Sequence, residues 1–250
     1  PDEDDALYFY RLTLFHEDMH GEALTYSARS LSLPLDLPVP MPLVLREPLQ
    51  VPATRWWMGL DDGGGFTFDN ERPAYEVAVP EFEIDAQAIT WSQYLEFVED
   101  GGYNRPELWQ PAGWAGLTTS LRNEKNKPLH RLGGQPAMHL SWWEADAWCR
   151  WAGRRLPSEV EWEVAAHTAG RLGFRWGDVW EWTSSPFRGY SGFVADPYRD
   201  YSEPWFGTHQ VLRGGCWATR ARLLRSTWRN FYRPERCDVW AGFRTCALQS

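Results

Sequence analysis

The sequence contains no run of about 20 apolar residues, the length that a helix needs to cross a bilayer, so we expect no membrane-spanning segment. Positive charge is also scarce, because 25 Lys and Arg face 34 Asp and Glu and the formal net charge is −9. The basic residues are scattered, which argues against a nucleic-acid groove or an anionic membrane patch. With 250 residues and no internal repeat or low-complexity tract, the chain has room for one large or two small domains.

Cysteine is rare, and the four residues Cys149, Cys216, Cys237 and Cys246 show no Cys-x-x-Cys spacing. Four thiols are too few for a disulfide scaffold, so we expect unpaired cysteines in a reduced, cytoplasmic protein. The acidic start, residues 1–5, lacks an initiator methionine and a signal peptide, as expected for the middle of a longer polypeptide.

Tryptophan, in contrast, is abundant, with 17 copies in the chain. So many large rings are not expected to pack together in one small core. Tryptophan also often lines sites for flat or cationic ligands. This composition therefore favours an aromatic ligand site.

Two histidines, His16 and His20, stand four residues apart in a segment with helical periodicity. Apolar residues recur at helical spacing through this segment, which predicts one amphipathic helix over residues 5–30. Side chains at i and i+4 lie on the same face of a helix, so both imidazoles can reach one metal ion. The acidic neighbours Glu17, Asp18 and Glu22 are of the kind that orient metal-bound histidines by hydrogen bonds.

Two other interpretations of this segment stay open. The histidines can be ordinary helix residues with no ligand role, because histidine is often only partly buried. The string His16-Glu17-x-x-His20 also matches the signature of zinc peptidases, in which the glutamate is the general base.

The rest of the chain predicts a linker and a loop-rich α+β domain. Residues 1–33 form a helical segment, the proline-rich residues 34–52 a linker, and residues 53–250 the domain. We predict strands at 76–79 and 82–85 and no helix beyond Gly170. Three helices are expected from their capping boxes: residues 91–99 after Thr90-x-x-Gln93, 142–152 after Ser141-x-x-Glu144, and 159–167 after Ser158-x-x-Glu161.

Several motifs between residues 51 and 247 resemble the formylglycine-generating-enzyme-like domain, an α+β unit with a C-type-lectin-like fold. They are Asp69-Asn70-Glu71-Arg72-Pro73, Ile89-Thr90-Trp91-Ser92-Gln93-Tyr94, Gly153-Arg154-Arg155-Leu156-Pro157-Ser158-Glu159, Gly177-Asp178-Val179-Trp180-Glu181-Trp182-Thr183, Leu212-Arg213-Gly214-Gly215-Cys216-Trp217 and Ala241-Gly242-Phe243-Arg244. The copper-binding cysteines of formylglycine-generating enzymes correspond to Thr219 and Leu224, so the resemblance disfavours formylglycine generation.

With its His-x-x-x-His-x-Glu motif, the chain is similar to the non-heme iron sulfoxide synthases of ergothioneine biosynthesis and their relatives, including selenoneine synthases. The resemblance implies that residues 1–33 end a helical-bundle (DinB-like) domain. It implies that His16 and His20 bind Fe(II), that Glu22 is a helix neighbour, and that a third histidine ligand lies upstream of this chain. The remaining histidines, His130, His139, His167 and His209, are expected to be structural.

The same resemblance implies a site for hercynine, an N-trimethylated histidine, and for a second small molecule that donates sulfur or selenium. Aromatic faces suit a quaternary ammonium group. Asn230, Phe231 and Arg236 match substrate-binding positions of the family, whereas Tyr232 replaces an aspartate that helps to hold γ-glutamylcysteine. Met19 replaces a glutamine, and its soft thioether tolerates sulfur or selenium nearby.

The family also uses an active-site tyrosine, which falls within residues 187–201 by the resemblance. Spacing places Phe193 there, and Tyr190, Tyr198 and Tyr201 are alternative phenolic proton donors. Arg213, Arg229 and Arg244 are expected to be structural, as are Trp180 and Trp182.

These resemblances imply an O₂-using Fe(II) enzyme that forms a C–Se or C–S bond on hercynine. The substitutions at Tyr232 and Met19 favour selenoneine synthesis from a selenosugar. The alternatives are a hercynine sulfoxide synthase that uses γ-glutamylcysteine or cysteine, a zinc hydrolase, and a non-catalytic lectin-like binding module. We expect no nucleic-acid or membrane partner.

Overall fold

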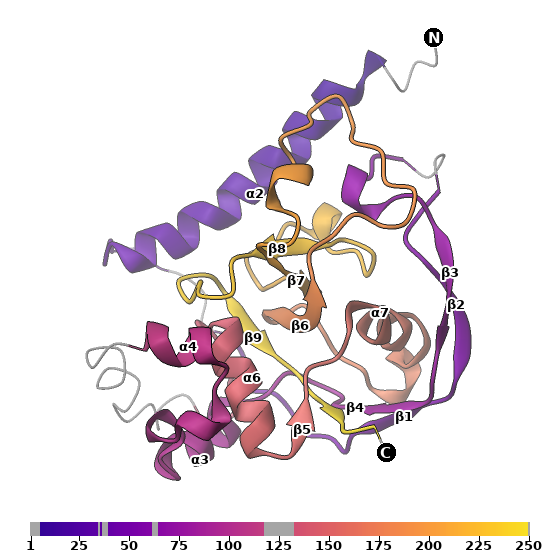
Figure 1. Ribbon diagram of the computed structural model, residues 1–250. Helices are drawn as coiled ribbons and strands as arrows, with labels where there is room; N and C mark the ends of the chain where they lie inside the picture. Colours follow the sequence, from indigo (N-terminus) through magenta and orange to yellow (C-terminus); the bar gives the residue numbers. More distant parts are fainter. Residues whose placement is uncertain (1–5, 35, 37–39, 62–64, 118–132, 250) are drawn as a thin grey trace.

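One long helix, α2 (Tyr8–Ser30), lies across one side of a loop-rich α+β domain, residues 49–249 (Figure 1). The computed structural model describes residues 6–34, 36, 40–61, 65–117 and 133–249. In the described part of the domain there are four further α-helices: α3 (Trp91–Glu99), α4 (Pro111–Gly116), α6 (Trp142–Trp151) and α7 (Glu159–Thr168). Among the described residues, no helix combines the length and hydrophobicity that crossing a bilayer requires.

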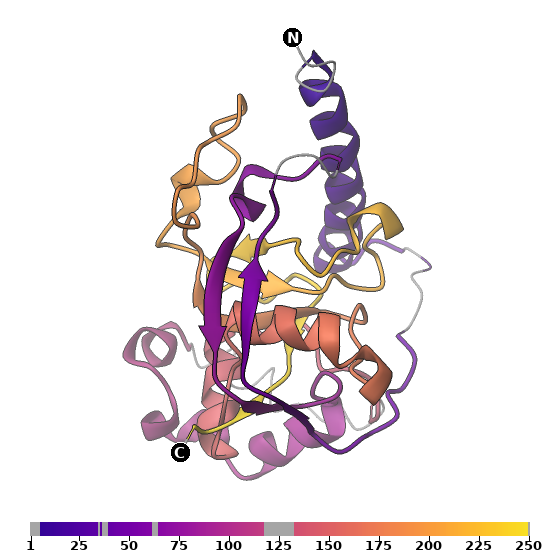
Figure 2. The same cartoon turned by 90° about the vertical axis from the view of Figure 1, so that its right-hand side faces the viewer.

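The strands form two four-stranded sheets and one hairpin. The first sheet has the order β1 (Leu49–Val51), β4 (Phe82–Ile84), β10 (Cys246–Ala247) and β5 (Arg154–Arg155), and is antiparallel. The second has the order β8 (Asn230–Tyr232), β7 (Gln210–Arg213), β6 (Trp180–Pro186) and β9 (Ala241–Phe243). Only β6 and β9 in that sheet run parallel. The hairpin of β2 (Thr54–Met58) and β3 (Tyr75–Val79) lies against α7 (Figure 2).

The three helices predicted from capping boxes are all present. Their N-cap hydroxyls, of Thr90, Ser141 and Ser158, each accept a hydrogen bond from the backbone N–H three residues on. The glutamine or glutamate at that third position accepts in return from the N-cap backbone, so both unpaired donors are satisfied. The ends of α6 and α7 differ from the prediction by one residue each.

The prediction was less accurate at the start of the domain. Strands β3 and β4 were expected, but Leu49–Val51 was assigned to a linker and instead forms β1. Leu49 pairs with Ile84 and Val51 with Phe82, so the first strand of the domain begins before residue 53. Three prolines between residues 40 and 48 masked this short strand, because proline is generally read as a strand breaker.

The tryptophans divide between the core and more exposed positions. Nine of the 17 are buried. Most of the buried indoles donate a hydrogen bond to a backbone carbonyl or a carboxylate, as Trp142, Trp162 and Trp182 do. Each ring therefore contributes both apolar area and a fixed polar contact to the core.

Three arginines of the second sheet region are almost fully buried, as expected for structural residues. Each guanidinium pairs with a carboxylate of α7 or β6, in the pairs Arg213–Glu163, Arg229–Glu159 and Arg244–Glu181. These ion pairs join α7 and β6 to segments between residues 213 and 244. No disulfide bond joins any two of the four cysteines, and Cys149, Cys216 and Cys246 are buried.

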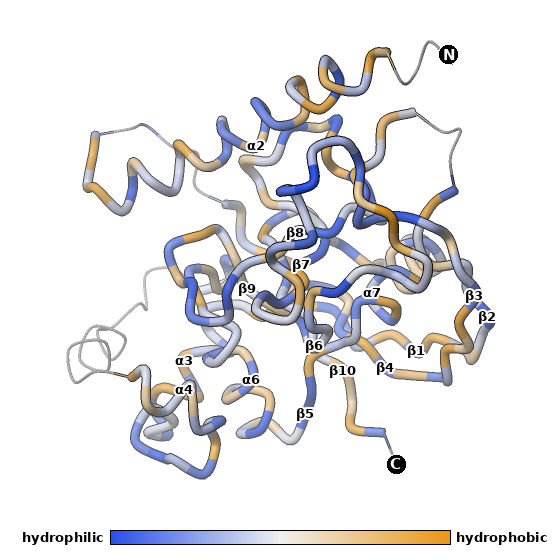
Figure 3. Tube along the Cα trace, turned by 45° about the horizontal axis from the view of Figure 1, so that its top comes forward, coloured by the Kyte–Doolittle hydropathy of each residue, from blue (hydrophilic) through white to orange (hydrophobic). Residues whose placement is uncertain are grey.

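Helix α2 has apolar residues on two sides, which Figure 3 shows as alternating colours along the helix. Its inner side packs on the main core through Leu12, Phe15, Met19 and Tyr26. On its outer side, Tyr10, Leu14 and Leu24 are 77%, 48% and 69% exposed. Only the inner side is therefore covered by the described residues.

Candidate functional site

The two predicted metal ligands lie on one edge of α2. Their ring centroids are 4.5 Å apart, with the ring planes at 79°. His16 is half-buried and His20 is exposed. The helical spacing therefore brings both imidazoles together, as the sequence predicted.

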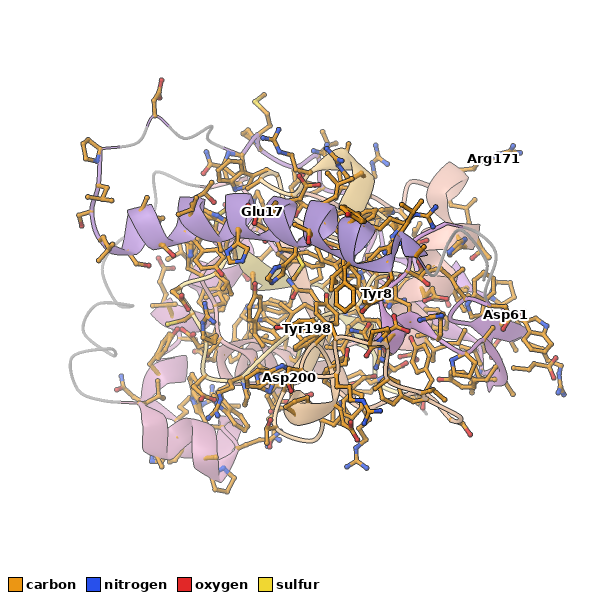
Figure 4. The ribbon with its side chains drawn as sticks, turned by 90° about the horizontal axis from the view of Figure 1, so that it is seen from above. Tyr8, Glu17, Asp61, Arg171, Tyr198 and Asp200 are labelled. Atoms are coloured by element: carbon orange, nitrogen blue, oxygen red, sulfur yellow. The ribbon has the colours of Figure 1, made fainter. Side chains whose placement is uncertain are left out.

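His16 forms part of the wall of a cleft between α2 and the α+β domain, with a volume of about 430 Å³. We call it the α2 cleft. Its other walls come from the loop after β6, from the start of β7 and from β8 with the turn that follows it. The lining residues are His16, Tyr198, Asp200, Tyr201, Trp205, His209, Phe231, Tyr232, Arg233 and Arg236. Figure 4 shows Tyr198 and Asp200 beside α2, on the same side of the helix.

The histidine pair suits a metal ion chemically but does not complete a site. Burial lowers the pKa of His16, and the nearby charge of His20 lowers it further. A neutral imidazole is the form that binds a metal. Within the part of the chain that the structure describes, no three His, Cys, Asp or Glu side chains are grouped closely enough to hold an ion. The described residues thus supply two ligands of an expected three.

The three acidic residues near the histidines differ in their exposure and in their hydrogen-bonding partners. Glu17 is exposed and does not line the α2 cleft. Asp18 pairs with Arg222, whose Nε lies 2.8 Å from the carboxylate. Glu22 is buried and accepts hydrogen bonds from Trp180 and Thr219. Burial raises the pKa of Glu22, and its hydrogen bonds oppose this shift. Asp18 and Glu22 thus bind the α+β domain.

Three of the predicted substrate-binding residues line the α2 cleft: Phe231, Tyr232 and Arg236. The ring of Phe231 stacks on Phe187 with 3.9 Å between centroids, which fixes its orientation. Arg236 lies over the Tyr232 ring and uses Nε and Nη2 to bind Asp238, at 2.6 and 2.7 Å. Its Nη1 remains on the side of the guanidinium that Asp238 does not occupy.

Two other predicted residues lie outside the cleft lining. The side-chain oxygen of the buried Asn230 accepts a hydrogen bond from the Phe231 backbone N–H at 2.9 Å. Met19 accepts a long hydrogen bond from the Tyr201 hydroxyl, at 3.8 Å from oxygen to sulfur. Both residues therefore support side chains of the cleft wall.

The predicted proton donors differ in whether they line the α2 cleft. Tyr198 lines the α2 cleft, whereas Tyr190 and Phe193 do not. Tyr190 is buried with the Arg229 guanidinium 4.1 Å above its ring, and Phe193 packs against Phe206. Tyr201, a candidate on the same footing as Tyr190 and Tyr198, also lines the cleft.

Four residues of the cleft wall were not predicted from the sequence: Asp200, Trp205, His209 and Arg233. His209 was expected to be structural, yet it forms part of the wall and contacts the ring of Phe231. Burial lowers the pKa of His209, and the charges of Arg233 and Arg236 act in the same direction. These residues lie in irregular loops and turns without a periodic pattern, so only their polar and aromatic character was visible.

The positions expected to carry copper ligands have other roles. Thr219 hydrogen-bonds Glu22, and Leu224 packs over Gly215. Burial raises the pKa of the Cys216 thiol. Because neither Thr219 nor Leu224 carries a thiol, these two positions do not provide the cysteine pair of a copper site.

Comparisons with known proteins show the family and the fold of this chain. Residues 45–178 and 175–248 match the model of the sulfatase-modifying factor enzyme 1-like domain. The hercynine oxygenase of Mycolicibacterium smegmatis is 31% identical, over 97% of this chain and 72% of the relative. The hercynine oxygenase of Mycobacterium tuberculosis has the same identity and coverage. The structure of PvdO from Pseudomonas aeruginosa shares the fold, with a TM-score of 0.56 and 19% identity over 83% of this chain and 99% of that chain.

Proposed function

This chain belongs to the family of sulfatase-modifying factor enzyme 1-like domains and, within it, to the relatives of hercynine oxygenases, and from this we propose that it oxidises hercynine. The reaction is an Fe(II)- and O₂-dependent formation of a C–Se or C–S bond on the imidazole ring. The observation that carries the proposal is the position of His16. A residue of the metal-binding helix forms one wall of the cleft whose other walls contain Phe231, Tyr232 and Arg236.

His16 and His20 would hold the iron through neutral imidazoles, together with a third histidine from outside this chain. A ferrous ion bound there would supply the activation of O₂ that the oxidation needs. The third ligand comes from further helices of a helical-bundle domain that cover the outer side of α2. The exposed apolar side chains of Tyr10, Leu14 and Leu24 support this arrangement.

Hercynine carries a quaternary ammonium group and a carboxylate, and the α2 cleft has partners for both. The faces of Trp205, Phe231 and Tyr232 suit the ammonium group, which has no N–H to donate. The free edge of Arg236 suits the carboxylate in a charge-assisted hydrogen bond. Stacking on Phe187 keeps Phe231 in place before the substrate arrives.

Tyr201 is the phenol that we place next to the reacting atoms. It is buried, and burial raises its pKa well above the ordinary value, so its hydroxyl stays protonated at neutral pH. The hydroxyl points to Met19, the residue that precedes His20. Tyr198 lines the same cleft but is 39% exposed, which gives its hydroxyl access to water.

The second substrate is a selenosugar in our proposal. Tyr232 stands where a carboxylate would hold an α-ammonium group, and a sugar donor has no such group. A thiol donor is the alternative, and one observation favours it: Asp200 places a carboxylate in the cleft wall. That carboxylate can pair with the α-ammonium group of γ-glutamylcysteine or cysteine.

The test is O₂ consumption and product mass for the full-length ferrous protein with hercynine and each donor in parallel. We expect a selenium adduct with the selenosugar and no product with γ-glutamylcysteine or cysteine. A sulfoxide from a thiol, lost in the Asp200→Asn protein, would establish the alternative. Turnover without O₂, or no product with any donor despite bound iron, would contradict the proposed reaction.

A further inference from the structure

Glu22 is the only carboxylate of α2 that is buried, at 6% exposure. Both of its oxygens accept hydrogen bonds from the α+β domain. The indole N–H of Trp180 donates to Oε1 at 2.7 Å, and the hydroxyl of Thr219 donates to Oε2 at 2.5 Å. The two donors lie 158 and 197 residues away along the chain. A buried, hydrogen-bonded carboxylate thus lies in the helix–domain interface, next to the apolar contacts of Leu12, Phe15 and Met19.

The donors are themselves fixed in position. Trp180 begins β6, and its backbone N–H bonds to the carbonyl of Trp240, which precedes the parallel strand β9. The Thr219 hydroxyl accepts from the backbone N–H of Cys216 at 2.9 Å, so the turn holds its orientation. One turn further along α2, Thr25 accepts from the indole N–H of Trp240 at 2.7 Å. The domain therefore presents a rigid set of donors to the helix.

The position of Glu22 relative to the histidines makes this contact important for the metal. Side chains are about 100° apart per residue around an α-helix, so Glu22 points roughly 200° around the axis from His20. The carboxylate faces the domain while the imidazole faces the cleft edge. A rotation of α2 by about 20° at a side-chain radius of about 5.5 Å would move an imidazole by roughly 2 Å. Metal–ligand distances tolerate only about 0.2 Å.

Apolar packing by itself restrains such a rotation weakly. The contacts of Leu12, Phe15 and Met19 are non-directional, so neighbouring rotations of the helix bury similar areas. Hydrogen bonds to a buried carboxylate weaken steeply when the angle changes, and an unpaired carboxylate in this interface is costly. Single buried polar groups are known to fix helix register in this way.

We infer that Glu22, Thr219 and Trp180 form a clamp that sets the rotation of α2 and thereby positions His16 and His20 for the metal. This inference rests on the proposed function. The three are positioning residues, because they lie behind the helix and do not line the α2 cleft. Trp180, which the sequence assigned to the core, gains this role through its N–H group.

The test compares Co(II) binding by the full-length protein and its Thr219→Val, Thr219→Ser and Thr183→Val variants. Thr183 is the matched control, because its buried hydroxyl also donates once, to the Val211 carbonyl, and accepts from one backbone N–H. Absorption titration under argon gives the Co(II) dissociation constant. The thermal midpoint without metal gives the stability of each protein.

We expect Thr219→Val to raise the dissociation constant about tenfold or more, the usual effect of losing a group that orients metal ligands. Thr219→Ser and Thr183→Val should stay within about twofold of wild type, although Thr183→Val lowers the thermal midpoint as much as Thr219→Val does. If Thr219→Val does not fold, Glu22→Gln tests the clamp instead, and its Co(II) binding should weaken in the same direction.

Equal Co(II) affinity for Thr219→Val and Thr183→Val would overturn the clamp, since the contact would then only stabilise the fold. A wild-type protein that binds no Co(II) would overturn the metal site itself, and with it any need for positioning. The two failures are therefore distinguishable in one set of titrations.

Discussion

Two tyrosines in the wall of the α2 cleft differ in burial, and this difference predicts different roles. Tyr201 is 8% exposed and points to Met19, whereas Tyr198 is 39% exposed. We expect Tyr201→Phe to lower turnover by about 100-fold or more, the usual contribution of a positioned proton donor. Tyr198→Phe should lower it much less. Turnover and the product ratio by mass check this, and the reverse order would assign the role to Tyr198.

Arg236 is predicted to bind the hercynine carboxylate. Losing one charged hydrogen bond costs about 1.5–3 kcal/mol, so Arg236→Met should raise KM for hercynine roughly 10- to 150-fold. The KM of a selenosugar donor should change little, because that donor has no carboxylate. Arg233→Met is the control, since Arg233 is 61% exposed at its side chain. An equal effect of both variants on KM would mean that only the net charge of the cleft matters.

At the scale of residues, the sequence could predict the histidine pair because a helix gives fixed geometry to positions four apart. Phe231, Tyr232 and Arg236 were found through a motif, and the structure places them in the same cleft as His16. Tyr190 and Phe193 were misplaced because the loop between β6 and β7 has no repeating geometry. Only the folded chain shows that Tyr201 faces α2 and that Tyr190 faces Arg229.

At the scale of elements, α6 depends on its capping box. The Ser141 hydroxyl donates to Glu144 at 2.8 Å, and Glu144 also accepts from the buried Tyr103 at 2.5 Å. We expect Ser141→Ala to lower the free energy of unfolding by about 1–2 kcal/mol. Ser158→Ala should cost less, because Arg155 still holds Glu161. Urea unfolding of both variants checks the order, and an equal loss would show that the Arg155–Glu161 ion pair does not compensate for the missing Ser158 hydroxyl.

Tyr8, in the first turn of α2, is predicted to contribute less to the free energy of unfolding at alkaline pH. Burial, helped by the charge of Asp196, raises the pKa of Tyr8 to about 12, whereas an unfolded tyrosine titrates near 10. The folded state therefore binds this proton more tightly, and the contribution of Tyr8 is lost as pH rises from about 10 to about 12. The stability difference between wild type and Tyr8→Phe should shrink over that range. Tyr10→Phe, at an exposed position, is the control.

Elements with a local signal were predicted well and those without one were not. The capping boxes specify α3, α6 and α7 because both hydrogen-bonding partners lie within four residues. Strand β1 has three residues and gains its hydrogen bonds only from β4, which lies 31 residues away at the closest pair. The core positions of Trp180 and Trp182 were expected from the family motif, whereas the acceptor of the Trp182 indole, the Leu140 carbonyl 42 residues away, could not be predicted.

At the scale of the whole molecule, bound metal should stabilise the fold. A ligand at 100 times its dissociation constant adds about 2.7 kcal/mol, or roughly 5–10 °C in the thermal midpoint of a chain of this size. We expect this shift with Co(II) for the full-length protein, and none for His16→Ala or His20→Ala. His167→Ala should keep it, because that ring contacts Trp56 and Ser226 and not α2. A shift that survives in His20→Ala would place the metal elsewhere.

The clamp on α2 also has a consequence for the order of synthesis. Within this chain the helix that carries His16 and His20 is translated first, yet the groups that hold it, Trp180, Thr219 and Trp240, emerge from the ribosome 158 to 215 residues later. Contacts of such long range form late in folding. A nascent or truncated polypeptide therefore exposes its two histidines on an undocked helix. Under the proposed function, the two imidazoles reach their final orientation only after the domain has folded.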